Sequence, residues 1–172
     1  MAKMMTSLVL GLALVATAGC TKKRPVDIPP GPGVDQGNNG GLDNGSGEEG
    51  TNALNEQFKR EVQSNTILFA YDQYDIDPAA RAILDSQARW LAARPNARIT
   101  IEGHCDERGT REYNLALGDR RANAAKNYLA ARGISPSQIN TISYGKERPV
   151  ALGSDEGSWA QNRRAVTIVI SG

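Results

Sequence analysis

The stretch from Thr21 to Asn55 most limits what this chain can fold into, because it has almost no large apolar side chain and no helical or strand period. Four of the eight prolines and eight of the eighteen glycines lie in it. Such a segment cannot bury enough apolar surface to offset the entropy that ordering costs. We therefore expect residues 20–55 to be a disordered linker and residues 56–172 to form the one folded domain.

The first residues have the layout of a secretory signal. Lys3 supplies a positive start, the residues from Leu8 to Val15 are mainly apolar, and small residues follow directly. This order is typical of a signal peptide with its cleavage region, so we expect residues 1–19 to be removed. A retained membrane anchor is the alternative, because the uncharged stretch is close to the shortest length that spans a bilayer.

The residue after this stretch indicates lipidation. Thr17-Ala18-Gly19-Cys20 is similar to the lipobox of bacterial lipoproteins, which implies that Cys20 is acylated and becomes the mature N-terminus. Two or three acyl chains hold a protein stably on a membrane, at about 0.8 kcal/mol per buried CH₂ group. The residue after Cys20 is Thr21 and not an aspartate. This resembles the enterobacterial lipoproteins that are sorted to the outer membrane. The alternative is that Cys20 is an ordinary cysteine near a secretory cleavage site.

The composition argues against several classes of function. Twenty Lys and Arg residues nearly balance nineteen Asp and Glu residues, for a formal net charge of +1. Nucleic-acid binding needs a clustered cationic surplus and often aromatic stacking platforms, but only 5% of the residues are aromatic. One histidine and two cysteines make a multi-histidine metal site and a disulfide scaffold improbable. We therefore expect no nucleic-acid partner, no metal and no cofactor.

Apolar periodicity in the folded part predicts alternating strands and helices. Short β-rich or alternating segments predict strands at 66–69, 98–102, 141–144 and 166–170. Helical spacing predicts one helix between Asp77-Pro78 and Pro95, and another from Glu112 to Arg132. Right-handed βαβ crossovers favour parallel first strands, while the last strand is free to run antiparallel to a neighbour. The sequence therefore predicts an α/β (α+β) domain of two layers, with helices covering a small mixed sheet.

The most unusual stretch is residues 103–110, Gly-His-Cys-Asp-Glu-Arg-Gly-Thr, between a predicted strand and a predicted helix. Loops at the carboxyl ends of strands are where α/β folds commonly place ligands. A metal site is disfavoured because consecutive side chains cannot all point at one ion. A nucleophile pair of His104 and Cys105 is disfavoured because neighbours on extended backbone point to opposite sides. For Asp106 alone, a helix cap or an internal ion pair remains an alternative to ligand binding.

Short motifs in and after this loop match a known family. They are residues 103–110, Glu112-Tyr113-Asn114, Leu117-Gly118, Arg120-Arg121-Ala122, residues 143–149 and Asn162-Arg163-Arg164. Together they resemble the OmpA-like peptidoglycan-binding domain. With the lipobox and the linker, the Asp-Glu-Arg-Gly-Thr version of the loop resembles the peptidoglycan-associated lipoproteins of the Tol-Pal system. Cys105 departs from the alanine or threonine that is usual at its position.

The resemblance implies a role for each matching residue. Asp106 matches the aspartate that receives the ammonium of meso-diaminopimelate in the cell-wall stem peptide, and Arg121 matches the arginine that receives its carboxylate. A carboxylate and a planar guanidinium suit such a zwitterion. Asp72 and Leu117 match further residues of the pocket, and Tyr74 is a candidate for its wall. As a solvent-facing pair, Asp106 and Arg121 are expected to add at most about 1 kcal/mol to the stability of the fold.

The family implies a non-enzymatic tether between outer membrane and cell wall, which serves envelope integrity and outer-membrane constriction during division. Cys20 would hold the protein in the outer membrane with the domain facing the periplasm, and TolB and other Tol-system proteins would be its partners. The alternatives are a scaffold that docks proteins without touching glycan, and a cell-wall hydrolase with Glu107 or Asp106 as its acid. Purified sacculi distinguish the three through reversible pull-down, no binding, or release of soluble fragments.

Overall fold

The structure is a computed structural model and describes residues 45–172, so the predicted signal peptide, Cys20 and the first part of the predicted linker lie outside the described residues. Its elements are α1 (Gly45–Glu61), β1 (Thr66–Leu68), α2 (Pro78–Ala92), β2 (Arg98–His104), α3 (Arg111–Ala131), a 3₁₀ turn (Pro136–Gln138), β3 (Ile139–Gly145), α4 (Glu156–Asn162) and β4 (Arg164–Ser171).

The four strands form one mixed sheet in the order β1-β4-β2-β3. β2 and β3 pair in parallel, whereas β4 pairs antiparallel with both of its neighbours, β1 and β2. The first three strands therefore run in one direction, and the last strand enters between the first and the second. The predicted α+β domain with a mixed sheet is confirmed, and its last strand is antiparallel.

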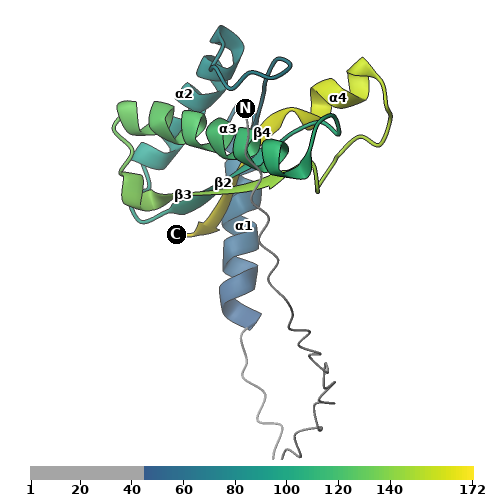
Figure 1. Cartoon of the computed structure of the whole chain (residues 1–172). Coiled ribbons are helices and arrows are strands. Elements are labelled where there is room, and N and C mark those ends of the chain that lie inside the picture. Colours follow the sequence, from purple (N-terminus) through teal and green to yellow (C-terminus); the bar gives the residue numbers. More distant parts are fainter. Residues whose placement is uncertain (1–44) are drawn as a thin grey trace, which may run out of the picture. The chain divides into compact units, whose positions relative to one another are not determined.

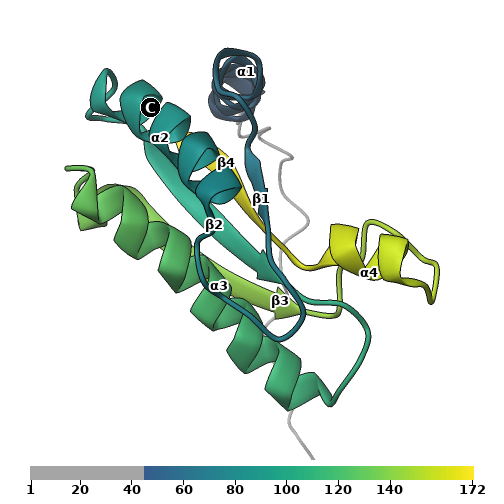
Figure 2. The same cartoon turned by 90° about the horizontal axis from the view of Figure 1, so that it is seen from above.

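The two long predicted helices, α2 and α3, lie together on one face of the sheet (Figures 1 and 2). Asp77 caps α2 as expected, because its carboxylate accepts a hydrogen bond from the Ala80 amide at 2.7 Å. The core lies between these helices and the sheet, where Leu84, Leu91, Ile99, Ile101 and Leu129 are fully or almost fully buried. No helix among residues 45–172 combines the length and the apolar character needed to cross a membrane.

Helix α1 begins inside the segment that was expected to be a disordered linker, so that prediction is wrong for residues 45–55. The physical reason is tertiary packing that local composition does not reveal. Phe58 is fully buried and meets the ring of Trp90 edge-on, with 5.0 Å between the ring centroids. The Asn55 side-chain oxygen accepts from the Val169 amide at 3.1 Å. The helix thereby covers the part of β4 that extends beyond the short β1.

Helix α4 was also missed, because its sequence reads as a polar loop. Asp155 caps it, accepting hydrogen bonds from the amide of Ser158 at 3.0 Å and from its hydroxyl at 2.8 Å. This cap begins the helix without any apolar stripe. Residues Glu156 and Trp159 of α4 take part in the polar network described below.

We expect Phe58→Ala to lower the free energy of unfolding by about 3 kcal/mol, because it removes a fully buried ring that fills the space between α1 and Trp90. The measurement is urea unfolding followed by circular dichroism. Arg60→Ala, an exposed change on the same helix, is the control and should shift the free energy by less than about 0.5 kcal/mol. Equal effects of the two changes would show that α1 does not belong to the core.

Candidate functional site

A pocket of about 280 Å³ opens where the loop after β1, the loop after β2 and the first turns of α3 meet. It is lined by Tyr71, Asp72, Cys105, Asp106, Arg108, Gly109, Tyr113, Asn114, Leu117 and Arg121. The structure therefore brings together four of the side chains that the sequence singled out, namely Asp72, Asp106, Leu117 and Arg121.

Two local features position α3 against this pocket. Thr110 caps the helix, since its hydroxyl accepts from the Tyr113 amide at 3.2 Å. Further along, α3 approaches β2 so closely that a Cβ atom on Gly103 would overlap the Gly118 carbonyl group. Because only glycine permits this approach, Arg121 on the next turn reaches the end of β2.

Arg121 is a fully buried side chain rather than a solvent-facing one. Its Nε donates to the Gln73 carbonyl at 2.9 Å, and its two terminal nitrogens donate to the carbonyls of His104 at 2.8 Å and Ala70 at 3.2 Å. Burial lowers the pKa of the guanidinium, but an arginine remains charged in proteins. Arg121 thus ties the loop after β1 to the end of β2.

The expectation of at most about 1 kcal/mol assumed a solvent-facing pair, and that assumption is wrong for both residues, because Arg121 is fully buried and Asp106 is only 5% exposed. Removal of the Arg121 side chain would take a donor from three backbone carbonyls, of which that of Ala70 still accepts from the Gln73 amide at 3.2 Å. A buried polar group that loses its partner costs about 1–3 kcal/mol. Arg121 serves the fold as well as the pocket, and tests of its binding role require a substitution that retains the positive charge.

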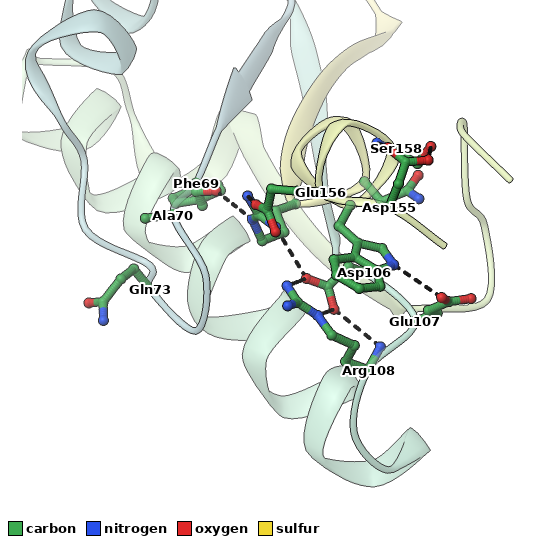
Figure 3. A network of polar contacts seen from close by, with 12 residues as sticks. Phe69, Ala70, Gln73, Asp106, Glu107, Arg108, Asp155, Glu156 and Ser158 are labelled. Carbon is green, nitrogen blue, oxygen red and sulfur yellow. Dashed lines mark hydrogen bonds and ion pairs between the residues drawn. The ribbon is translucent and has the colours of Figure 1, made fainter. Parts of the chain in front are cut away.

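Asp106 forms its hydrogen bonds with arginines other than Arg121 (Figure 3). The Nε and one terminal nitrogen of Arg108 donate to its two oxygens at 3.1 and 2.6 Å, and Arg163 contributes a longer contact of 3.4 Å. Burial raises the pKa of Asp106, but the hydrogen bonds from Arg108 and Arg163 outweigh it and bring the pKa below its ordinary value. Asp106 is therefore an ionised carboxylate in an internal ion pair, and Thr110, not Asp106, caps the helix.

Asp72 lies at the rim of the same pocket and accepts a hydrogen bond from the Tyr113 hydroxyl. Its φ of 56° places it in the left-handed region, where residues other than glycine are uncommon. Such a conformation costs free energy and persists only where the surroundings impose it.

Tyr74, which was expected in the pocket wall, is not among the lining residues. It is exposed, and the Arg120 guanidinium lies 6.0 Å from its ring centroid. Sequence reasoning instead missed Arg108 and its aromatic neighbours. The Arg108 guanidinium carbon lies 4.1 Å from the ring centroids of both Tyr71 and Trp159. The position of Arg108, two residues after Asp106, is a local signal that the two side chains could pair. The contact with Trp159 could not be predicted, because it depends on α4, which the sequence did not reveal.

The rest of the loop does not form a catalytic pair or a cation site. Cys105 lines the pocket, whereas His104 does not and instead stacks on Tyr144, with 5.6 Å between the ring centroids. Burial, with further lowering by Arg164 and Arg148, reduces the pKa of His104 to about 4. Within residues 45–172, no group of three or more His, Cys, Asp or Glu side chains is arranged to hold a metal ion.

The Cys105 thiol is expected to react slowly while the protein is folded. It is buried and donates to the Asn114 carbonyl at 3.3 Å, and burial raises its pKa from 9.0 to about 11. Because only the thiolate reacts, labelling near pH 8 should be about 100-fold slower than for an ordinary cysteine. A thiol-exchange assay on a Cys20→Ser chain measures this, with the urea-unfolded chain as the control. Equal rates in the two states would show that the thiol is accessible.

Comparisons with known proteins agree with this architecture. The model of the OmpA family matches residues 68–163. A peptidoglycan-associated lipoprotein of Rhizobium meliloti is 48% identical over 165 residues, which cover 96% of this chain and 86% of that protein. One from Pseudomonas putida is 45% identical over 155 residues, 90% of each chain. The crystal structure of the peptidoglycan-associated lipoprotein from Burkholderia pseudomallei superposes with a TM-score of 0.61 at 45% identity, over 62% of this chain and 90% of that one. The chain therefore belongs to the OmpA family and, within it, to the peptidoglycan-associated lipoproteins.

Proposed function

We propose that this protein is an outer-membrane lipoprotein that binds peptidoglycan non-covalently, through the meso-diaminopimelate of stem peptides. The observation that carries this proposal is the presence of Asp106 and Arg121, two opposite charges, in the lining of one pocket of about 280 Å³. The free end of a diaminopimelate side chain carries an ammonium and a carboxylate, which suit these two groups. The relatives are named for their association with peptidoglycan, which supports the same ligand.

The contacts of each side chain suggest how the ligand is held. A guanidinium has five N–H donors, and Arg121 gives three of them to backbone carbonyls. The other two face the pocket side chains, Cys105 among them, and would serve a ligand carboxylate. Asp106, which is ionised, receives the ammonium. The apolar side chain of Leu117 offers a surface for the methylene groups that join this zwitterionic end to the rest of the stem peptide. Asp72 at the rim supplies a further acceptor.

The remaining parts of the proposal concern the setting of this domain. Cys20 carries the acyl chains in the outer membrane, and the domain faces the periplasm. TolB and other Tol-system proteins are its protein partners, and the tether maintains the envelope and the constriction of the outer membrane during division. The support for these statements is the lipobox-like sequence around Cys20 and the resemblance to the Tol-Pal lipoproteins.

The carboxyl groups of the loop suit binding better than hydrolysis. A glycosidase needs one carboxylic acid whose pKa is raised, so that it can protonate the leaving group. The pKa of Glu107 is lowered instead, by hydrogen bonds from Ser154 and Trp159, and the pKa of Asp106 is lowered as well. Neither group is suited to act as a general acid near neutral pH.

Substitutions that keep the fold should weaken binding to purified sacculi. Asp106→Asn removes the charge that receives the ammonium, and such a loss in a desolvated site costs about 2–5 kcal/mol, or about 30-fold and upward in affinity. Arg121→Lys keeps the positive charge but loses the planar fork, so we expect about tenfold weaker binding. The double variant should bind little worse than the weaker single variant, because both side chains hold one ligand.

The controls are Asp119→Asn and Arg120→Lys, the same changes at exposed positions of α3 that lie outside the pocket lining. Thermal melts confirm that each variant is folded. Folded Asp106 and Arg121 variants that bind like the controls would place the ligand elsewhere. Release of soluble fragments by the unchanged protein would indicate a hydrolase, and no retention at all would favour a protein-docking scaffold.

Lipidation is tested separately. Cys20→Ala is expected to leave the precursor or a soluble form, because the acyl chains provide the membrane affinity. Mass spectrometry of the mature N-terminal peptide should find acyl mass on the cysteine of the unchanged protein. Full partition of the variant with the outer membrane, together with an unmodified wild-type cysteine, would exclude the lipoprotein assignment.

A further inference from the structure

The oxygens of Asp106 are already saturated with donors in this structure. Oδ1 accepts from the backbone amide and the Nε of Arg108, both at 3.1 Å. Oδ2 accepts from a terminal nitrogen of Arg108 at 2.6 Å and from Arg163 at 3.4 Å. A carboxylate offers about four lone-pair positions, so an incoming ammonium finds none free. Any cation that binds Asp106 must first replace one of these donors.

Of the two arginines on Asp106, only Arg108 is placed to leave. The Arg163 side chain is 7% exposed, and its other nitrogens donate to the Phe69 carbonyl at 3.0 Å and to Glu156 at 2.6 Å. Its contact with Asp106 is also the longest of the four. The Arg108 side chain is 30% exposed, and its side-chain hydrogen bonds go to Asp106.

Two aromatic rings provide a place for the Arg108 guanidinium that does not depend on Asp106. The guanidinium lies between Tyr71 and Trp159, 4.1 Å from each ring centroid. Trp159 is held in turn, because its indole N–H donates to Glu107 at 3.0 Å. Cation–π contacts attract a guanidinium from above or below an aromatic ring. The rings can therefore retain Arg108 at the rim of the pocket when its bonds to Asp106 are exchanged.

We propose that Arg108 is a built-in competitor: its guanidinium occupies the ammonium position on Asp106 in the unliganded protein, and the ligand's ammonium displaces it from Asp106 while Tyr71 and Trp159 retain it. This inference rests on the proposed function, because it requires a ligand ammonium at Asp106. The exchange keeps the buried carboxylate paired at every stage. The exchange also selects against simple amines. A simple amine has to displace the Arg108 guanidinium, which makes two hydrogen bonds to Asp106, and it has no carboxylate that could bind Arg121.

The test is calorimetric titration of the full chain with a purified stem tripeptide that ends in meso-diaminopimelate. Arg108→Gln removes the competing charge and keeps a planar side chain beside the rings. We expect it to bind the tripeptide about tenfold more tightly than the unchanged protein, because one charge-assisted interaction no longer has to be broken. Arg120→Gln removes the same charge from an exposed neighbour outside the pocket and should change the affinity by less than about twofold.

Arg108→Lys is the second variant, in case the glutamine variant does not fold. It keeps the charge but loses the fork, so we expect a smaller gain of about threefold. Folded Arg108 variants that bind equally or more weakly than the unchanged protein would overturn the inference, since Arg108 would then assist the ligand. If the unchanged protein and every variant fail to bind the tripeptide, the proposed function fails and this inference fails with it.

A readout independent of affinity is the nuclear magnetic resonance signal of the Arg108 Nε–H. It should shift when the unchanged protein is saturated with the tripeptide, because the bond to Asp106 is exchanged. A signal that stays in place while the tripeptide is bound would show that Arg108 never leaves Asp106.

Discussion

The buried guanidinium of Arg121 is the interaction on which the site and much of the fold depend. It donates to carbonyls of Ala70 and Gln73 in the loop after β1 and to that of His104 at the end of β2. These segments are far apart in the sequence, and no other single side chain joins them through three such bonds in the described part of the chain. Their separation sets the width of the pocket. A cation buried at this depth is tolerated because the carbonyl dipoles and the Phe69 ring, 5.2 Å away, replace its hydration.

A second network extends from α4 into the loop. Glu156 pairs with Arg163 at 2.6 Å, Arg163 reaches Asp106, and Asp106 holds Arg108. Trp159 of α4 makes a second connection to the loop, because its ring lies against Arg108 and its indole N–H donates to Glu107. A short helix that contributes no side chain to the pocket lining thus helps to position Arg108 and Arg163, which hold Asp106. Figure 3 shows the hydrogen bonds and ion pairs of this network around Asp106 and Arg108.

The sequence predicted the features that depend on neighbouring residues in the chain, and it missed those that depend on contacts between distant elements. Apolar periodicity and caps such as Asp77 are local, so the strands and the two long helices were predicted correctly. Motif matches singled out four residues that line one pocket, namely Asp72, Asp106, Leu117 and Arg121. Helix α1 was missed because the packing of Phe58 against Trp90 cannot be seen in the local sequence, and α4 was missed because it has no apolar stripe.

The burial of Arg121 was missed because it depends on the close approach of Gly118 in α3 to Gly103 in β2. Tyr74 was misplaced because its local sequence does not reveal which side of the loop faces the pocket.

The two charges of the pocket are therefore not equivalent. Arg121 is fixed by three backbone bonds, so a ligand carboxylate meets donors that need no rearrangement. Asp106 is paired with a movable cation, so the ligand's ammonium gains only the difference between its own interaction and that of Arg108. On the proposed function, the ligand carboxylate binds a preformed anchor, whereas the ligand ammonium has to exchange with Arg108. A ligand with only one of the two groups loses either the preformed anchor or the group that exchanges with Arg108, and the pocket thereby discriminates a zwitterion from a simple amine or acid.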